Sequence, residues 1–291
     1  MNLNTRTLID VIFSRLVWIT GFLVISILLG ILSMLIFNGF KFFLSIESLS
    51  FWKGVFWSPD EHYSIFPLLM GTMFVTLLSM AIAIPVGIFT AAYISEFAPN
   101  WFRNLSKPMI EILASIPSVV IGFIGIVVIG PFLSTFFQVS NGLNALNGSI
   151  LLAVMAMPTI ISISEDAIHA VPKSHKEASF AMGANRWQTL FRVTLPTASP
   201  GLIAASMLGM GRALGETMTV LMATGNVPMP PTGVLDSIRT ITATIAIEMG
   251  EVPYHSTHYY ALFAIALVLF SITLLVNLTG EYFANRFRKF Q

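Results

Sequence analysis

The stretch EASFAMGANRWQTLFRVTLP, from Glu177 to Pro196, is the longest polar-rich segment between two very apolar regions of the chain. Its pattern predicts two short helices that meet at a glycine corner. Gly183 suits the left-handed turn that commonly ends a helix. Pro196 predicts the end of the second helix or a kink in it, because proline lacks the backbone N–H that a helix interior uses.

Capping signals support both helices. Ser174 and Glu177 have the spacing of a capping box at the start of the first helix. Asn185 and Gln188 have the same relation at the start of the second. We expect the exposed face of such a hairpin to be able to dock into a groove on another protein. A helical hairpin that lies at a membrane surface without a partner is the alternative interpretation.

The same spacing resembles the cytoplasmic loop of permeases in bacterial ABC importers. That loop reads E-A-A, three residues, G, nine residues, I, one residue, L-P. The residues that fit or replace this pattern here are Glu177, Ala178, Ser179 (for the second alanine), Gly183, Val193 (for the isoleucine), Leu195 and Pro196. In the family the loop sits in a cleft of the ATPase subunit, and the resemblance implies the same coupling role for residues 172–196 here.

The composition predicts an integral membrane protein. Of the 291 residues, 55% are hydrophobic and 10% are charged, and the mean hydropathy is +0.82. A soluble domain carries about 25% charged residues. The absence of cysteine excludes a disulfide framework, thiolate catalysis and a zinc–thiolate site. The sequence has no Gly-Lys dipeptide and so no phosphate-binding P-loop, and ATP would have to act through a separate subunit.

Charge-free intervals predict an all-α fold with six transmembrane helices, since about 20 apolar residues cross a bilayer. They are residues 16–40, 63–95, two helices within 112–164 divided by the polar patch 140–148, about 197–224, and 259–280. The first interval is too long for a cleavable signal. We also expect an interfacial helix around residues 46–55, and a short outer helix or re-entrant piece within 234–249.

We divide the chain into an N-terminal transmembrane helix with an outer interfacial segment (1–65) and a five-helix permease core (66–291). Basic residues orient it, because Lys and Arg are enriched in cytoplasmic segments. With a cytoplasmic N-terminus, 11 of the 15 lie inside, three lie outside, and Arg212 lies within a span. This bias predicts that both termini and the hairpin are cytoplasmic.

Arg212 and Glu216 form the candidate substrate site. They lie four residues apart in the fifth predicted span, which would place them on one helix face. Ionisable groups in a span are rare and are candidates for function. Arginine suits a tetrahedral oxyanion, and Glu216 could balance its charge or accept a hydrogen bond from a protonated oxyanion. A self-satisfied intrahelical ion pair is the alternative. The small residues Ala205, Gly209 and Ala213 predict close helix packing.

A second resemblance is to the phosphate importer permeases of the PstC type, which are MetI-like inner-membrane components of binding-protein-dependent transport systems. It is carried by GRALGET from Gly211 to Thr217, by Gly225-Asn226, and by SIPSVV from Ser115 to Val120 followed by Gly122 and Gly125. In that family the matching arginine and glutamate are implicated in phosphate translocation. The sister permease of the same complex is similar too, so the choice between the two subunits stays open.

The two resemblances imply a multi-pass permease of the bacterial cytoplasmic membrane that imports inorganic phosphate and is not itself an enzyme. They also imply an ATP-binding subunit that acts as a dimer, a homologous second permease and an extracytoplasmic phosphate-binding protein. We expect contact with membrane lipid, and no cofactor, metal, catalytic residue or nucleic acid. Two alternatives remain, a permease for another oxyanion such as molybdate or sulfate, and a proton-coupled secondary anion carrier that titrates Glu216.

Other charged residues near the cytoplasmic face have simpler interpretations. Glu165, Asp166 and His169 share a helix face and would suit a metal site or a membrane enzyme, but we interpret them as a solvated helix end. Glu96 and Glu111 bracket a short cytoplasmic loop, and we interpret them as solvent-exposed charge.

Overall fold

The computed structural model describes residues 3–44, 51–52, 54–59 and 62–288, which are mostly helical. Its helices are α1 (Leu3–Phe43), α3 (Phe66–Glu96), α4 (Asn100–Ser115), α5 (Ser118–Ile124), the π-helical turn η1 (Gly125–Ile129), α6 (Gly130–Phe137), α7 (Ala145–His169), α8 (Lys173–Ala181), α9 (Arg186–Thr189), the π-helical turn η2 (Leu190–Thr194), α10 (Leu195–Gly215), α11 (Met218–Ala223), α12 (Ile241–Glu248) and α13 (Thr257–Arg288). The short strands β1 (Trp57–Ser58) and β2 (His62–Tyr63) pair antiparallel.

Six helical segments of the described chain are long and apolar enough to cross a membrane, which confirms the all-α, six-span prediction. They are Ile12–Phe43, Phe66–Glu96, Ser118–Phe137, Ala145–His169, Arg186–Gly215 and Thr257–Phe283. The fifth begins and ends earlier than predicted. Helix α12 confirms a short helix within 234–249, whereas the interfacial helix expected around 46–55 falls largely outside the described residues.

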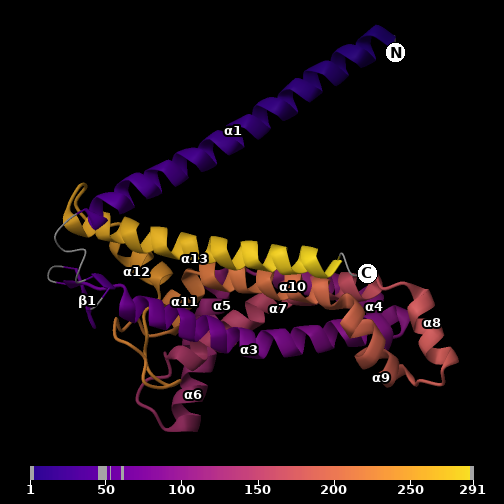
Figure 1. Cartoon of the computed structure of the whole chain (residues 1–291). Coiled ribbons are helices and arrows are strands. Elements are labelled where there is room, and N and C mark those ends of the chain that lie inside the picture. The colour runs from indigo at the N-terminus through magenta and orange to yellow at the C-terminus, as the bar shows by residue number, and fades with distance from the viewer. Residues whose placement is uncertain (1–2, 45–50, 53, 60–61, 289–291) are drawn as a thin grey trace.

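The spans form a bundle with α7 at its centre. Helix α7 packs against α3 on one side and α10 on another, and α13 packs against both α10 and α1. Figure 1 shows α1 leaving this bundle at an angle and meeting α13 only toward one end. The β1–β2 hairpin and α12 lie at that end. Helices α8 and α9 lie at the opposite end, where α13 also finishes (Figure 1).

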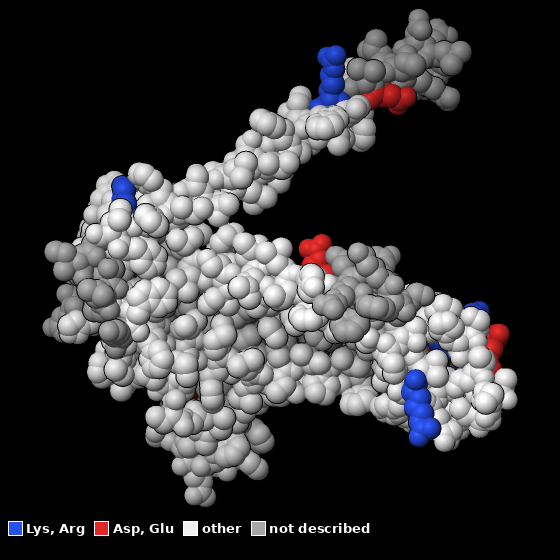
Figure 2. Space-filling model, in the orientation of Figure 1, with Lys and Arg blue, Asp and Glu red and all other residues white. Residues whose placement is uncertain are grey.

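Charge is distributed along the molecule as a membrane environment requires. In the view of Figure 2, charged side chains gather mainly at the end that carries α8 and α9 and at the two ends of α1. Most of the visible surface between them is uncharged. The middle of α1 is exposed on all sides and apolar, with residues such as Phe22 and Leu28 more than half accessible. Such a helix is stable only in lipid or against another membrane-embedded surface.

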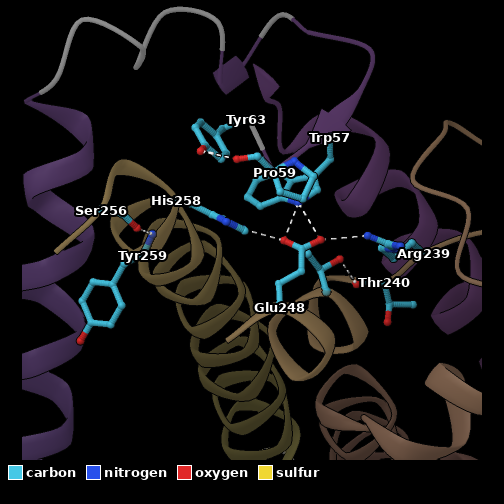
Figure 3. A network of polar contacts seen from close by, with 10 residues as sticks. Trp57, Pro59, Tyr63, Arg239, Thr240, Glu248, Ser256, His258 and Tyr259 are labelled. Carbon is cyan, nitrogen blue, oxygen red and sulfur yellow. Dashed lines mark hydrogen bonds and ion pairs between the residues drawn. The ribbon is translucent and has the colours of Figure 1, made fainter. Parts of the chain in front are cut away.

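A buried carboxylate ties together the end of the bundle that carries β1. Glu248, at the end of α12, accepts hydrogen bonds from Trp57 Nε1 at 2.9 and 3.2 Å and from Arg239 Nη1 at 2.9 Å (Figure 3). Its second oxygen lies 2.8 Å from His258 Nε2 of α13. The carboxylate therefore joins β1, the segment before α12, α12 itself and α13. The sequence indicated none of these contacts.

Replacing Glu248 with alanine should destabilise this end of the fold. Glu248 is 8% exposed and the Arg239 side chain 17%, so the substitution leaves a shielded guanidinium without its partner. Removing one member of a buried ion pair costs about 3–5 kcal/mol. We expect a lower Tm for Glu248→Ala in detergent micelles than for Glu251→Ala, a matched control at an exposed position. Equal Tm values for the two variants would show that the contacts of the Glu248 carboxylate do not stabilise this end of the fold.

Candidate functional site

The helix that carries Arg212 ends sooner than the sequence predicted. Helix α10 stops at Gly215, and Glu216 has an extended backbone with φ −69° and ψ 132°. Arg212 and Glu216 therefore do not lie on one face of one continuous helix, and that prediction was wrong. Two contacts hold the break. The Thr219 N–H donates to Glu216 Oε1 at 3.3 Å, and the Thr242 hydroxyl donates to the Glu216 carbonyl at 2.8 Å.

Arg212 bridges two other helices. Its Nη1 donates to the Thr159 hydroxyl of α7 at 3.2 Å, and its Nη2 donates to the Ala114 carbonyl near the end of α4 at 3.4 Å. Within the described residues no ion pair joins Arg212 to Glu216, so the self-satisfied intrahelical pair is not formed. A guanidinium has five N–H donors, and these contacts occupy two of them.

The exposure of Arg212 indicates what its side chain faces. Arg212 is exposed in this chain although it belongs to a membrane span. A charge in a span faces the interior of a bundle or a water-filled path, because contact with lipid tails is costly. The exposed face of α10 at Arg212 is thus a surface for water or another protein subunit. A guanidinium on such a surface can bind an oxyanion through paired N–H donors.

Close packing around Ile160 sets the position of Arg212. A methyl group built on Gly209 of α10 would lie 2.6 Å from Ile160 Cγ1, and one built on Gly87 of α3 would lie 2.7 Å from Ile160 Cγ2. Ile160 is fully buried, so its side chain fills the space that both glycines leave. This wedge holds α7 against α3 and α10, and Thr159 is the neighbouring residue. The predicted close approach at Ala205, Gly209 and Ala213 is confirmed, since all three are buried.

The hairpin at the other end of α10 agrees with the sequence in two respects. Gly183 has φ +83°, the left-handed conformation that was predicted. Asn185 and Gln188 form a reciprocal capping box at the start of α9, with both hydrogen bonds 2.9 Å long.

The hairpin departs from the prediction in two other places. Helix α8 begins at Lys173 directly after Pro172, so Ser174 lies inside the first turn and does not cap it. The predicted helix end at Pro196 is wrong, because α10 continues through the proline, and the π-helical turn η2 directly before α10 is a feature at which helices bend. A proline ring clashes with the carbonyl four residues earlier, and the wider turn moves that carbonyl away.

The predicted hairpin residues lie on both sides of this corner. Glu177, Ala178 and Gly183 are exposed, and Ser179 is half-buried because its hydroxyl lies 2.9 Å from that of Thr189. Pro196 is exposed and Leu195 is half-buried at the start of α10. Leu195 and Pro196 therefore share one helical segment, Arg186–Gly215, with Arg212 near its far end, and the other coupling residues lie just before that segment.

The prediction of a solvated helix end holds for Asp166 and His169, which are exposed, but is wrong for Glu165. Glu165 is only 5% exposed, and its Oε2 lies 2.7 Å from Lys107 Nζ of α4. Asp166 lies 3.7 Å from the same ammonium. The hydrogen bond to Glu165 is the main cause that raises the pKa of Lys107 above its ordinary value, and partial burial opposes it. No group of three metal-ligating side chains is found in the part of the chain that the structure describes.

A second polar cluster lies in the segment between α11 and α12. The Asp236 carboxylate accepts from the Thr232 hydroxyl at 2.6 Å and from the backbone N–H groups of Thr232 and Gly233 at 2.8 and 2.7 Å. These hydrogen bonds, the hydroxyl first, lower the pKa of Asp236. The ionised carboxylate thereby stabilises a turn at the bundle end opposite to α8.

Comparison with known proteins identifies the family to which this chain belongs. The family model described as "Binding-protein-dependent transport system inner membrane component" matches residues 83–289. The chain belongs to this family. As an inner membrane component of a transport system, it is a multi-pass permease subunit and not an enzyme.

Individual relatives agree with the family assignment. The "Probable ABC transporter permease protein YqgH" of Bacillus subtilis (strain 168) is 40% identical over 93% of this chain and 87% of its own length. The "Phosphate transport system permease protein PstC" of Mesorhizobium japonicum is 32% identical over 96% of this chain and 91% of its own. A permease chain of the inward-facing MetNI methionine ABC transporter has a TM-score of 0.56 at 21% identity, covering 77% of this chain and 94% of its own, and shares the fold.

The Ile160 wedge predicts which glycine of α10 can be replaced. Gly209→Ala places a methyl group against a buried side chain, and such overpacking costs about 1–3 kcal/mol. Gly215→Ala is the matched control, because a methyl group there meets nothing within 4 Å. We expect a lower Tm in detergent for Gly209→Ala only. A Gly209→Ala variant as stable as Gly215→Ala would contradict the wedge.

Proposed function

We propose that this chain is the transmembrane permease subunit of an ATP-driven importer that moves inorganic phosphate inward across the cytoplasmic membrane. The observation that carries the proposal is the exposed guanidinium of Arg212 within a membrane span. Its described hydrogen bonds, to Thr159 and Ala114, use two of its five N–H donors. The relative from Mesorhizobium japonicum, a phosphate transport system permease, supports phosphate as the anion.

In this proposal Arg212 binds the anion and Glu216 helps to select it. Phosphate near neutral pH carries an O–H group that can donate to a carboxylate, whereas sulfate has none. A carboxylate that faces sulfate meets a like charge with no proton to share. The break after Gly215 supports this role, because Glu216 lies outside α10 and its half-buried carboxylate uses Oε1, in the described hydrogen bonds, for the Thr219 N–H.

The hairpin is the proposed docking element for the ATPase. Its candidate contact residues are Glu177, Ala178, Ser179, Gly183, Leu195 and Pro196. Support comes from the exposure of α8, which buries none of its side chains, and from Met182, which is 89% exposed at the corner. An apolar side chain so exposed outside the spans is well suited to a pocket on a partner protein.

The complete transporter would contain three kinds of partner. These are an ATP-binding subunit that acts as a dimer, a homologous second permease that faces Arg212, and an extracytoplasmic phosphate-binding protein at the end that carries α12. The proposed topology has both termini in the cytoplasm. It is supported by the basic-residue bias and by the position of α13's end on the same side as α8 and α9 (Figure 1).

Uptake by variants tests the site. Arg212→Ala in the reconstituted complex should lower phosphate uptake by roughly ten- to a hundredfold, the size expected for a lost hydrogen bond to a charged group. Arg212→Lys should fail largely as well, because an ammonium lacks the planar fork of donors. Glu216→Gln should retain some uptake and reject sulfate less. Arg15→Ala, which changes an arginine in α1, is the control.

The measurement is uptake of labelled phosphate and sulfate together with basal ATPase activity in the same proteoliposomes. Full phosphate uptake by Arg212→Ala would rule out the site. Raised basal ATPase activity with unchanged selectivity would mean that the pair gates the path and does not bind the ion. Uptake that needs no ATP and is abolished by an uncoupler would instead indicate a secondary carrier.

A further inference from the structure

Helix α8 has no packed face. None of its nine residues is buried, so hydrophobic contact with the bundle does not fix its orientation. Two polar contacts reach it from neighbouring elements. The Ser179 hydroxyl lies 2.9 Å from that of Thr189 in α9, and the Lys176 ammonium lies 2.5 Å from Glu96 Oε1. The first contact stays within the hairpin, whereas the second leaves it.

The ion pair joins the hairpin to a different transmembrane helix. Glu96 is the last residue of α3 and is 80 positions from Lys176 in the sequence. The two side chains are 22% and 19% exposed, so solvent screens them less than it screens an open surface pair. The sequence had led us to interpret Glu96 as solvent-exposed charge, and this interpretation was wrong.

The second helix of the hairpin contacts the same end of α3. The rings of Phe97, which follows α3 directly, and Trp187 of α9 are stacked with centroids 4.5 Å apart and planes 29° apart. Arg103 of α4 donates to the carbonyl oxygens of Ile94 and Ser95 and so also holds this end of α3. Adjacent residues 96 and 97 thus receive one contact from each helix of the hairpin.

The Glu96–Lys176 ion pair and the Phe97–Trp187 stack together form a clamp between the hairpin and α3. Helix α3 leads from this clamp to the candidate substrate site. Gly87 lies nine residues before Glu96 on the same helix, and it packs against Ile160. Ile160 in turn neighbours Thr159, which accepts from Arg212. A displacement of α3 would therefore act on Ile160, the neighbour of the residue that accepts from the guanidinium. The covalent route through η2 and α10 reaches Arg212 from the other side.

We propose that Glu96 and Lys176 are positioning residues that fasten the hairpin to α3, so that the two move as one body during transport. The proposal rests on the proposed function, in which the hairpin docks on the ATPase. The motor then moves two helices of the permease together, α10 through the chain and α3 through the clamp. The wedge at Ile160 lies between those two helices.

Charge reversal tests the clamp in the complete complex of both permeases, ATPase and binding protein. The readout is phosphate taken up per ATP hydrolysed in proteoliposomes. Glu96→Lys and Lys176→Glu should each lower this ratio by about tenfold, a size typical of coupled charge pairs. The double variant Glu96→Lys/Lys176→Glu should recover the ratio. Glu111→Lys is the matched control, since Glu111 is exposed on α4 and has no ion-pair partner among the described residues.

A purely structural role would lower the yield of assembled complex and leave the ratio unchanged in what assembles. Unchanged ratios in both single variants would overturn the proposal, as would a double variant no better than the singles. If the unaltered complex hydrolyses ATP but takes up no phosphate, the proposal that phosphate is the substrate is wrong. Cross-linking then tests the clamp without a transport substrate.

This chain has no cysteine, so the two introduced thiols are the only ones that it offers to a cross-linking reagent. The double variant Glu96→Cys/Lys176→Cys should react with a short bifunctional thiol reagent both without nucleotide and with ATP and vanadate, because the two positions stay together. This result needs no transport substrate. Where phosphate uptake is measurable, the cross-linked complex should retain it. Cross-linking in only one nucleotide state, or uptake abolished by the cross-link, would mean that the hairpin slides along α3.

Discussion

The side chain of Ile160 between two glycines is the contact on which the rest of the structure depends. Gly87 of α3 and Gly209 of α10 leave the space that it fills, and a methyl group at either glycine would come within 2.7 Å of it. Membrane helices gain little from apolar burial against one another, since lipid is equally apolar, so close fit decides their register. Here the fit brings α3, α7 and α10 together and thereby places Thr159 beside Arg212.

The second constraint is the cost of charge and unpaired backbone in a membrane. Buried carboxylates near the ends of the bundle each have a basic partner, as Glu165 has Lys107 and Glu248 has Arg239. Arg212 differs, because it is exposed within a span and, among the described residues, donates to one hydroxyl and one carbonyl oxygen. Such a charge is tolerated within a membrane where water, substrate or a partner protein contacts it. The presence or absence of an oppositely charged partner thus distinguishes the structural ion pairs from the candidate site at Arg212.

Local signals in the sequence predicted local structure well. Charge-free intervals gave the six spans, and the positive φ of Gly183 and the capping box of Asn185 follow from residues within a few positions of each other. Two local signals failed, the Ser174–Glu177 capping box and the helix end at Pro196, and the other failures required distant partners. Glu216 leaves the helix because Thr242 of α12 holds its carbonyl. The Ile160 wedge joins three segments, and no spacing within any one of them indicates the other two.

The central claim is that Arg212, held by α7 and α4, faces the path of the anion between this permease and its partner. The most direct measurement is a cryo-electron microscopy structure of the assembled transporter, trapped with phosphate inside the membrane domain. We expect density for the anion within hydrogen-bond distance of the Arg212 guanidinium, with the Thr159 contact retained. Phosphate bound elsewhere in the path, with Arg212 facing lipid or sealed against the second permease, would contradict it.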